Sequence, residues 1–245
     1  MVYDANYWNT KWAQAPIVYT GRALRGQRAN VGTDVRNFII TNDVILQQII
    51  KQYGLKKIAM NDTALACQKW VVQFLYYKDD QLANQCPEFW QFPFETLEMG
   101  TGDCEDGAIL MASLMTSAGI PAYRVKVCAG YVQESPTAPQ GGHCYCIYLA
   151  DKKDGQDDQC WVILDWCYAE DSQVAIEAKP LAKNGGQQNM YRDVWFTFNN
   201  ENSWNQSAIS IAPRIANRDL QSISQAFNVD VLQSIMNFIK AKYNA

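Results

Sequence analysis

Three residues of this chain have the side chains needed for nucleophilic attack on a carbonyl group. Cys104 follows the glycines of the run GTGDCEDG, His143 is the only histidine among 245 residues, and Asp165 lies near the end of the apolar run WVILDW. A thiol becomes an effective nucleophile when a nearby base takes its proton, and a carboxylate can orient that base. The sequence therefore contains one candidate nucleophile, base and orienting residue, in that order.

The residues around Cys104 predict that it begins a buried helix. Asp103 is the expected N-cap, and Glu105 and Asp106 lie in the first turn, where carboxylates favour the positive end of the helix dipole. Apolar residues then continue at helical spacing from position 109 to 114. The free N–H groups at the helix start favour a thiolate, whereas the adjacent carboxylates oppose it. The helix end alone is therefore not enough, and a base should complete the activation.

The histidine and the aspartate lie in two predicted strands. GGHCYCIYLA opens after a glycine pair, and QCWVILDWCY ends near Asp165. Alternation by two places His143 on the same face as Tyr145, and Asp165 on the same face as Ile163. If the two strands are neighbours, Asp165 can orient the imidazole while His143 takes the proton of Cys104.

These residues belong to a longer pattern that resembles the transglutaminase-like superfamily, and bacterial transglutaminase-like cysteine proteinases in particular. The matching stretches are FWQFPFETLEMGTGDCEDGAILMASLMTSAGIPAYRV, then GGHCYCIYL, then WVILDW, within roughly residues 61–168. The resemblance implies Cys104 as nucleophile, His143 as base and Asp165 as orienting residue.

The resemblance also implies a fold, and this sequence differs from the usual family pattern at a few positions. The expected fold is α+β with a transglutaminase-like, or papain-like, core, in which the nucleophile helix packs on an antiparallel sheet. Cys144 and Cys146 stand where the family often has Ala-Trp, and Trp166 stands where it often has proline. These differences leave the triad intact and concern the substrate pocket.

Two further roles concern residues beside the nucleophile. Acyl transfer forms an oxyanion that needs preplaced N–H donors, and the backbone of Cys104 with the side chain of Gln91 or Trp90 are candidates. The alternative for Trp90 is a place in the core.

Asp103, Glu105 and Asp106 are candidate calcium ligands, because hard cations bind clustered carboxylates, and some relatives bind calcium close to this motif. Capping and dipole interactions explain the same three residues without a metal, and no cofactor is expected to be required.

The rest of the chain divides into three predicted regions. Residues 1–36 form an N-terminal arm, residues 37–183 the catalytic domain, and residues 184–245 an Asn/Gln-rich extension with a C-terminal helix. The arm either wraps its own domain or docks on a neighbouring subunit. The apolar face of the C-terminal helix likewise covers the domain or binds a partner.

Local signals predict the elements of the central region. Thr41 or Asn42 should cap a helix that Gly54 ends, and Asn61 or Asp62 should start a long amphipathic helix. Residues 86–98 read as a loop, Asp154-Gly155 as a hairpin turn, and WFTF at 195–198 as an edge strand. A helix stop is expected at Gly119.

Composition excludes some classes of protein and restricts others. Twenty-one basic against 25 acidic residues give a net charge of −4, which does not favour sequence-independent nucleic-acid binding. No apolar run approaches the roughly 18 residues of a membrane span, and the N-terminus lacks the pattern of a signal peptide. The expectation is a protein made in the cytoplasm.

Its eight cysteines match no common zinc module and are interpreted as reduced core thiols, with disulfides as the alternative.

Two functions from different classes follow. The first is a thiol enzyme, either a cysteine protease or amidase that hydrolyses peptide or glutamine amides, or a transglutaminase that transfers the acyl group to an amine. The second is a structural part of an assembly, such as a phage virion or tail, because similar domains occur in bacteriophage genomes. Its partners would be neighbouring subunits, bound through the arm and the C-terminal helix.

Overall fold

The computed structural model describes residues 3–22, 31–135, 137–151, 160–182 and 190–205. At their centre is helix α6 (Cys104–Ser117), whose residues are nearly all buried. A helix that is buried on every side needs partners all around it. One side of α6 contacts strands β5 (Val125–Val132) and β6 (Gly141–Leu149), and its other sides contact three helices.

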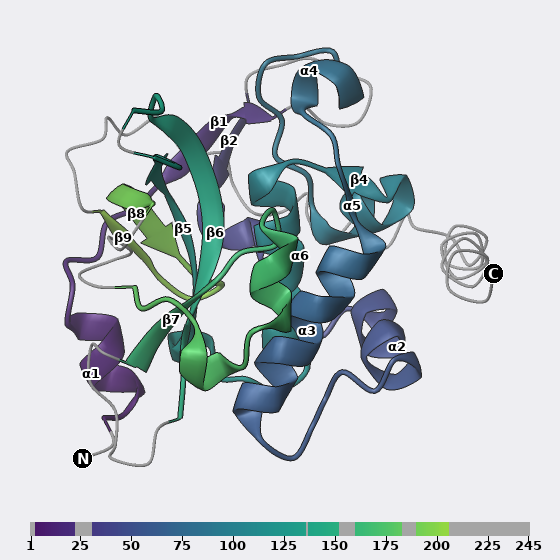
Figure 1. The fold of residues 1–245 in the computed structure, drawn as a ribbon, viewed down its shortest axis with the longest axis vertical. Coiled ribbons are helices and arrows are strands. Elements are labelled where there is room, and N and C mark those ends of the chain that lie inside the picture. Colours follow the sequence, from purple (N-terminus) through teal and green to yellow (C-terminus); the bar gives the residue numbers. More distant parts are fainter. Residues whose placement is uncertain (1–2, 23–30, 136, 152–159, 183–189, 206–245) are drawn as a thin grey trace.

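Those three helices and α6 form one layer of the fold. They are α2 (Val44–Gln52), α3 (Met60–Phe74) and α5 (Pro93–Met99). Figure 1 shows these helices gathered on one side of the sheet, with α6 between the sheet and α3. The apolar side chains between the layers form the larger hydrophobic core. This layer fixes the position of the first turn of α6, where Cys104 lies.

The second layer is a five-stranded antiparallel sheet in the order β7-β6-β5-β8-β9. Its remaining strands are β7 (Trp161–Leu164), β8 (Tyr191–Phe198) and β9 (Ser203–Asn205). Strands β6 and β7 are neighbours, and Ile147 lies opposite Ile163 in their register. The adjacency on which the proposed pairing of His143 with Asp165 depends is therefore present. The α+β architecture expected from the sequence is confirmed.

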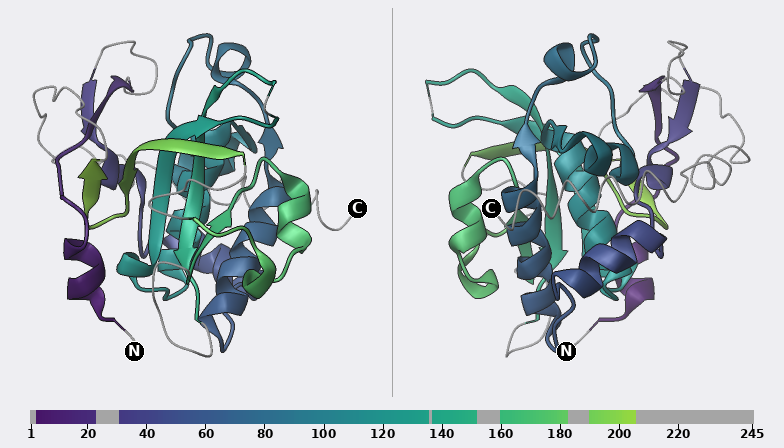
Figure 2. Two further views of the ribbon diagram at one scale, coloured as in Figure 1. Left: turned by 60° about the vertical axis from the view of Figure 1, so that its left-hand side comes forward. Right: turned by 90° about the vertical axis from the view of Figure 1, so that its right-hand side faces the viewer.

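The N-terminal segment packs on the far face of the sheet. Helix α1 (Ala5–Thr10) buries Trp8 completely, and its indole meets Trp161 edge-on at 5.6 Å between ring centroids. The ammonium group of Lys126 on β5 lies 3.6 Å from the ring centroid of Trp12 and 3.9 Å from that of Trp204. Such cation–π contacts are stronger when they are removed from water. Figure 2 shows α1 on the opposite side of the sheet from α3. This part of the arm thus packs on the sheet of its own chain.

Shorter elements connect these layers. They are the hairpin of β1 (Val18–Arg22) and β2 (Val31–Asp34), the parallel pair of β3 (Tyr76–Tyr77) and β4 (Thr101–Gly102), helix α4 (Asp80–Ala83), and 3-10 turns at Val35–Phe38, Ala122–Arg124, Ala169–Gln173 and Ile176–Ala178. Strand β4 leads directly into α6. Figure 2 shows the β1–β2 hairpin projecting away from the five-stranded sheet.

Several predicted element boundaries need correction. Asp43, rather than Thr41 or Asn42, caps α2, because its carboxylate accepts from the N–H groups of the first turn. Helix α3 starts at Met60, before the expected caps Asn61 and Asp62. Residues 93–99 form α5 instead of continuing a loop. The 195–198 segment belongs to β8, which lies between β5 and β9 and so is not at the sheet edge.

Other expectations are confirmed or lie outside the described residues. Gly54 and Gly119 have positive φ angles and follow the ends of α2 and α6, as predicted. The Asp154-Gly155 turn and the C-terminal helix fall in residues that the structure does not describe, and the three-region division of the chain stays a prediction. Among the described helices, none has the length and hydropathy of a membrane span.

Candidate active site

The first turn of α6 presents Cys104 as the sequence predicts. Asp103 precedes the helix in extended conformation, and its backbone N–H donates to Asp106 Oδ2 at 3.3 Å. A Cβ on Gly102 would lie 2.6 Å from the Cβ of Asp106, so this approach requires a glycine. The close contact between strand β4 and the first helical turn therefore holds Cys104 at the helix N-terminus.

The surroundings of the Cys104 thiol disfavour its ionisation. Burial, followed by the charge of Glu105, raises the pKa of Cys104 well above its ordinary value. The thiol donates to Glu105 Oε2 at 3.3 Å. In this arrangement the thiol faces an acceptor and stays protonated, so a change in its surroundings is needed to make it a nucleophile.

His143 and Asp165 form a short, buried pair. Nε2 of the imidazole lies 2.6 Å from Asp165 Oδ2, and Asp165 is completely buried. Because an ionised carboxylate can only accept, the imidazole is the donor, and this arrangement leaves Nδ1 as the position that can act as a base. Nδ1 has no hydrogen-bond partner in the part of the chain that the structure describes. The predicted pairing of base and orienting residue is therefore present.

Further contacts hold the carboxylate of Asp165 in place. Its Oδ1 accepts from the backbone N–H of Cys167 at 2.9 Å, and its Oδ2 also accepts from the hydroxyl of Tyr191 at 3.0 Å. The side chain of Gln68 on α3 donates to the Asp165 carbonyl at 2.9 Å. Strand alternation identified Asp165, but no local signal in the sequence pointed to Gln68 or Tyr191.

Trp166 and Cys167 connect the pair to the nucleophile. The indole of Trp166 donates to the Cys104 carbonyl at 3.0 Å. The Cys167 thiol lies within 4.8 Å of the ligand atoms of both His143 and Asp165, and its negative form also raises the pKa of Cys104. The residues after β7 therefore reach from the His143–Asp165 pair to the start of α6.

The structure does not join Cys104 to His143 directly. Across the described residues, no hydrogen bond links the Cys104 sulfur to the imidazole, and the thiol is turned toward Glu105. The imidazole contacts the rings of Tyr145, Tyr168 and Tyr191. The catalytic set of Cys104, His143 and Asp165 thus stays a prediction. The structure contains the His143–Asp165 pair and a cysteine at the start of α6, but no hydrogen bond between the two parts among the described residues.

A cluster of buried carboxylates lies on the other side of Cys104. One carboxylate oxygen each of Asp80, Asp103 and Asp106 lie within 4.8 Å of one another. A second group, made of one carboxylate oxygen each of Asp103 and Glu105 and the Cys104 sulfur, lies within the same distance. Burial raises the pKa of Asp103 to about 6, and burial and mutual repulsion raise the pKa values of Glu105 and Asp106 well above their ordinary range. Like charges at this separation are costly unless protons or a cation neutralise them.

This cluster has the donor set that a hard cation requires. Asp103 Oδ1 and Glu105 Oε1 are buried and have no hydrogen-bond partner among the residues that the structure describes. No ion pair to a described lysine or arginine compensates Asp80, Asp103, Glu105 or Asp106. Calcium binds carboxylate oxygens in flexible geometries. The predicted ligands Asp103, Glu105 and Asp106 therefore fit calcium, and Asp80 joins them from α4, where no local sequence signal indicated it.

The two candidate oxyanion donors differ in the structure. The Trp90 indole donates to Glu88 Oε1 at 2.7 Å, and its ring packs between aromatic side chains that include Tyr19 and Phe198. Trp90 is thus a core residue whose N–H is already used. Gln91 is completely buried, and neither side-chain polar atom has a partner among the described residues. Gln91 stays a predicted oxyanion donor.

The cysteines outside the site form no disulfide among the described residues. Cys67, Cys128, Cys144, Cys146 and Cys160 are buried, whereas Cys86 is partly exposed. The Cys146 thiol donates to the Ala108 carbonyl at 3.1 Å, so this side of β6 faces α6. His143, one position before Cys144, belongs to the other side by alternation.

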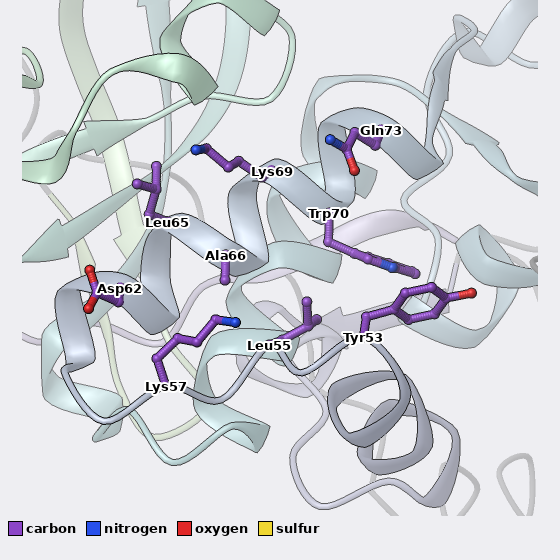
Figure 3. A pocket seen from close by; sticks show the side chains of 9 residues that line it. All are labelled: Tyr53, Leu55, Lys57, Asp62, Leu65, Ala66, Lys69, Trp70 and Gln73. Carbon is purple, nitrogen blue, oxygen red and sulfur yellow. The ribbon is translucent and has the colours of Figure 1, made fainter. Parts of the chain in front are cut away.

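A separate groove of about 550 Å³ lies along α3, and the triad residues do not line it. Figure 3 shows Tyr53, Leu55 and Trp70 along one part of it, and Lys57 and Lys69 among its charged residues. It contains no cysteine or histidine. The chemistry of the candidate nucleophile therefore belongs to the start of α6 and not to this groove.

Comparison with known proteins confirms the family resemblance seen in the sequence. Residues 48–166 match the family described as the transglutaminase-like superfamily, and this segment contains Cys104, His143 and Asp165. No curated protein matches significantly.

Solved structures with a similar arrangement include two of LapG from Legionella pneumophila. The EGTA-treated form is 16% identical, with a TM-score of 0.47, covering 80% of this chain and 98% of that one. The calcium-bound form is 14% identical, with a TM-score of 0.41, covering 82% and 99%. Both TM-scores are below 0.5, so these two similarities support no functional conclusion for this chain.

Proposed function

Because residues 48–166 match the transglutaminase-like superfamily, we propose that the protein is a thiol enzyme that cleaves peptide or glutamine amide bonds. The observation that carries the proposal is the 2.6 Å contact between His143 and Asp165, which Trp166 and Cys167 connect to the cysteine at the N-terminus of α6. A purely structural role would not require that a helix-start cysteine, a histidine and a buried aspartate paired with it all be present.

In the proposed reaction, Cys104 is the nucleophile and His143 is the base. Nδ1 of His143 takes the thiol proton, and the sulfur attacks the amide carbonyl carbon to form a tetrahedral oxyanion. The imidazolium then returns the proton to the leaving amine, and a thioester remains on Cys104. Asp165 stabilises the imidazolium through Nε2, while the Cys104 N–H and Gln91 are candidate donors to the oxyanion. Water completes hydrolysis, whereas an amine would complete transfer.

The reaction requires the thiol to leave Glu105. Its sulfur donates to Glu105 in the structure and has no hydrogen bond to His143 among the described residues, so the thiol and the imidazole must first be brought together before His143 can take the proton. We expect the arrangement with the thiol on Glu105 to be the resting one and the arrangement with the thiol on His143 to be the reactive one.

Calcium is proposed as an accessory ion held by Asp103, Glu105, Asp106 and Asp80. Its chemistry there would be electrostatic, because a divalent charge offsets the carboxylates that raise the pKa of Cys104. Glu105, once engaged in binding, would also be a poorer acceptor for the thiol. LapG from Legionella pneumophila has been solved in a calcium-bound form, but the choice of ion for this chain rests on its own buried carboxylates.

The alternative function is a structural component of an assembly. The family match gives this alternative no support, and part of the N-terminal arm packs on the sheet of its own chain. Enzymatic hydrolysis is therefore the function that we place first.

The test separates hydrolysis from transfer with two probes. Purified protein is incubated with denatured casein, with and without a fluorescent primary amine, in calcium or in chelator. For the wild type we expect new casein fragments and little fluorescence bound to casein. In Cys104→Ala we expect no fragments and no bound fluorescence. Cys67→Ala is the matched control, because Cys67 is a fully buried thiol on α3 outside the site. Amine incorporation without fragments would indicate transfer, and full activity in Cys104→Ala would contradict the proposed nucleophile.

A further inference from the structure

Tyr191 contacts the base–orienter pair from a strand outside the matched family segment. It is the first residue of β8, lies opposite Val132 on β5, and is almost completely buried. Its hydroxyl donates to Asp165 Oδ2 at 3.0 Å, the same oxygen that lies 2.6 Å from His143 Nε2. Two donors, from β6 and β8, therefore converge on one carboxylate oxygen at the end of β7.

The position of the Tyr191 ring is fixed by its neighbours. The ring centroid lies 4.6 Å from that of Tyr145 and 6.5 Å from that of His143. Tyr145 is itself stacked on the imidazole, with centroids 5.9 Å apart. The phenol is thus packed against the same rings that hold the imidazole, and its hydroxyl has a defined direction.

We propose that Tyr191 is a positioning residue that holds the Asp165 carboxylate and, through it, sets the orientation of the His143 imidazole. This inference rests on the proposed function, because it assigns a role within that site. Tyr191 does not touch the substrate or the reacting sulfur in this assignment, and it acts only through Asp165.

The physical reason is that several donors hydrogen-bond to the one buried carboxylate of Asp165. Asp165 is completely buried, and its charge is stabilised by the Cys167 N–H, the Tyr191 hydroxyl and the imidazole. When the Tyr191 hydroxyl is removed, the carboxylate has one fixed donor fewer, and the imidazole that it orients is held less firmly.

Three other titratable groups lie around the pair. Cys167, after β7, and Tyr145, on β6, both face the pair, while Tyr168 meets the imidazole edge-on and has its hydroxyl 3.4 Å from Glu134. None of these groups changes in the substitution of Tyr191. The proposed change therefore acts through the Asp165 carboxylate.

The test measures alkylation of Cys104 against pH by mass spectrometry, in calcium, for the wild type and for Tyr191→Phe and His143→Ala. Losing a hydrogen bond to a buried charge predicts that the alkylation rate at neutral pH falls about tenfold in Tyr191→Phe, because the imidazole is no longer held in one orientation. Tyr148→Phe is the matched control, because it removes a phenol hydroxyl on β6 that bonds to Asn61 instead.

A second substitution keeps the test valid if Tyr191→Phe folds poorly. Site-specific 3-fluorotyrosine at position 191 retains the ring and makes the hydroxyl a stronger donor, so the alkylation rate at neutral pH should rise above that of the wild type. If His143→Ala slows alkylation but both changes at Tyr191 leave the wild-type profile, the positioning role is wrong and the proposed function stands. If His143→Ala has no effect either, the proposed function fails, and the role of Tyr191 fails with it.

Discussion

Substitution of Gly107 by alanine tests how the nucleophile helix is held. Gly107 lies one turn into α6, and a Cβ there would lie 2.2 Å from Nε1 of Trp166 and 2.3 Å from its Cε2. That indole is almost fully buried and donates to the Cys104 carbonyl. The methyl group of alanine therefore cannot be added unless the indole moves away from Cys104.

The size of the effect follows from three contributions. Replacing glycine by alanine in a helix interior normally stabilises it by about 1 kcal/mol. Overpacking a dense core costs about 1–3 kcal/mol, and losing a hydrogen bond so that a buried donor is unpaired costs about 1–3 kcal/mol. We expect Gly107→Ala to lower the free energy of unfolding by about 1–5 kcal/mol, and the position of the Cys104 thiol should change as well.

The assay is urea denaturation of Gly107→Ala, alone and combined with Trp166→Leu. Gly141→Ala is the control, because a Cβ at Gly141 would meet no atom within 4 Å. In the Trp166→Leu background the alanine should no longer destabilise the protein, since the indole that it displaces is gone. Equal destabilisation with and without Trp166 would refute the reasoning.

Two further predictions concern the carboxylate cluster. Because the pKa of Asp103 is raised from 3.8 to about 6, the folded state binds a proton more tightly than the unfolded chain, so wild-type stability should fall as pH rises from about 4 to about 6. Asp103→Asn should show a smaller fall in urea midpoint across that window, and an unchanged fall would contradict the assignment. Calcium at a hundredfold its dissociation constant should stabilise the wild type by about 3 kcal/mol. A melting temperature that is the same in calcium and in chelator would exclude the cation site, and Glu105→Gln should weaken the effect.

The parts of the site that could be predicted are those with a local sequence signal. Asp103 and Cys104 are placed by a cap residue, a glycine-rich turn and a helical pattern, all within a few positions. His143 and Asp165 are placed by strand alternation and by the order of neighbouring strands. These features depend on backbone periodicity, which short stretches of sequence encode.

The parts that were missed depend on contacts between distant segments. Asp80, on a short helix, joins the carboxylate cluster through tertiary packing, and Tyr191 reaches Asp165 from a strand more than 20 positions later. No periodicity identifies either contact. The central place of β8 in the sheet was missed for the same reason, because strand order is a long-range property.

Helix α5 was predictable in principle. Pro93 occupies its first turn, and Glu95 accepts from the backbone N–H of Phe92 at 2.8 Å, which is a recognisable start signal. The aromatic residues around it favoured a loop interpretation. The burial of Trp90 beside Phe92 shows that those aromatics pack in the core that this helix covers.

The central claim is that His143 activates Cys104, and the alkylation rate of each cysteine against pH, measured by mass spectrometry in calcium, tests it most directly. We predict that Cys104 reacts faster than the other seven cysteines at pH values below the ordinary thiol pKa of about 8.5, and that His143→Ala removes this advantage. If Cys104 reacts no faster than the others, or reacts equally fast without His143, the thiol–imidazole pair does not form and the proposed mechanism is wrong.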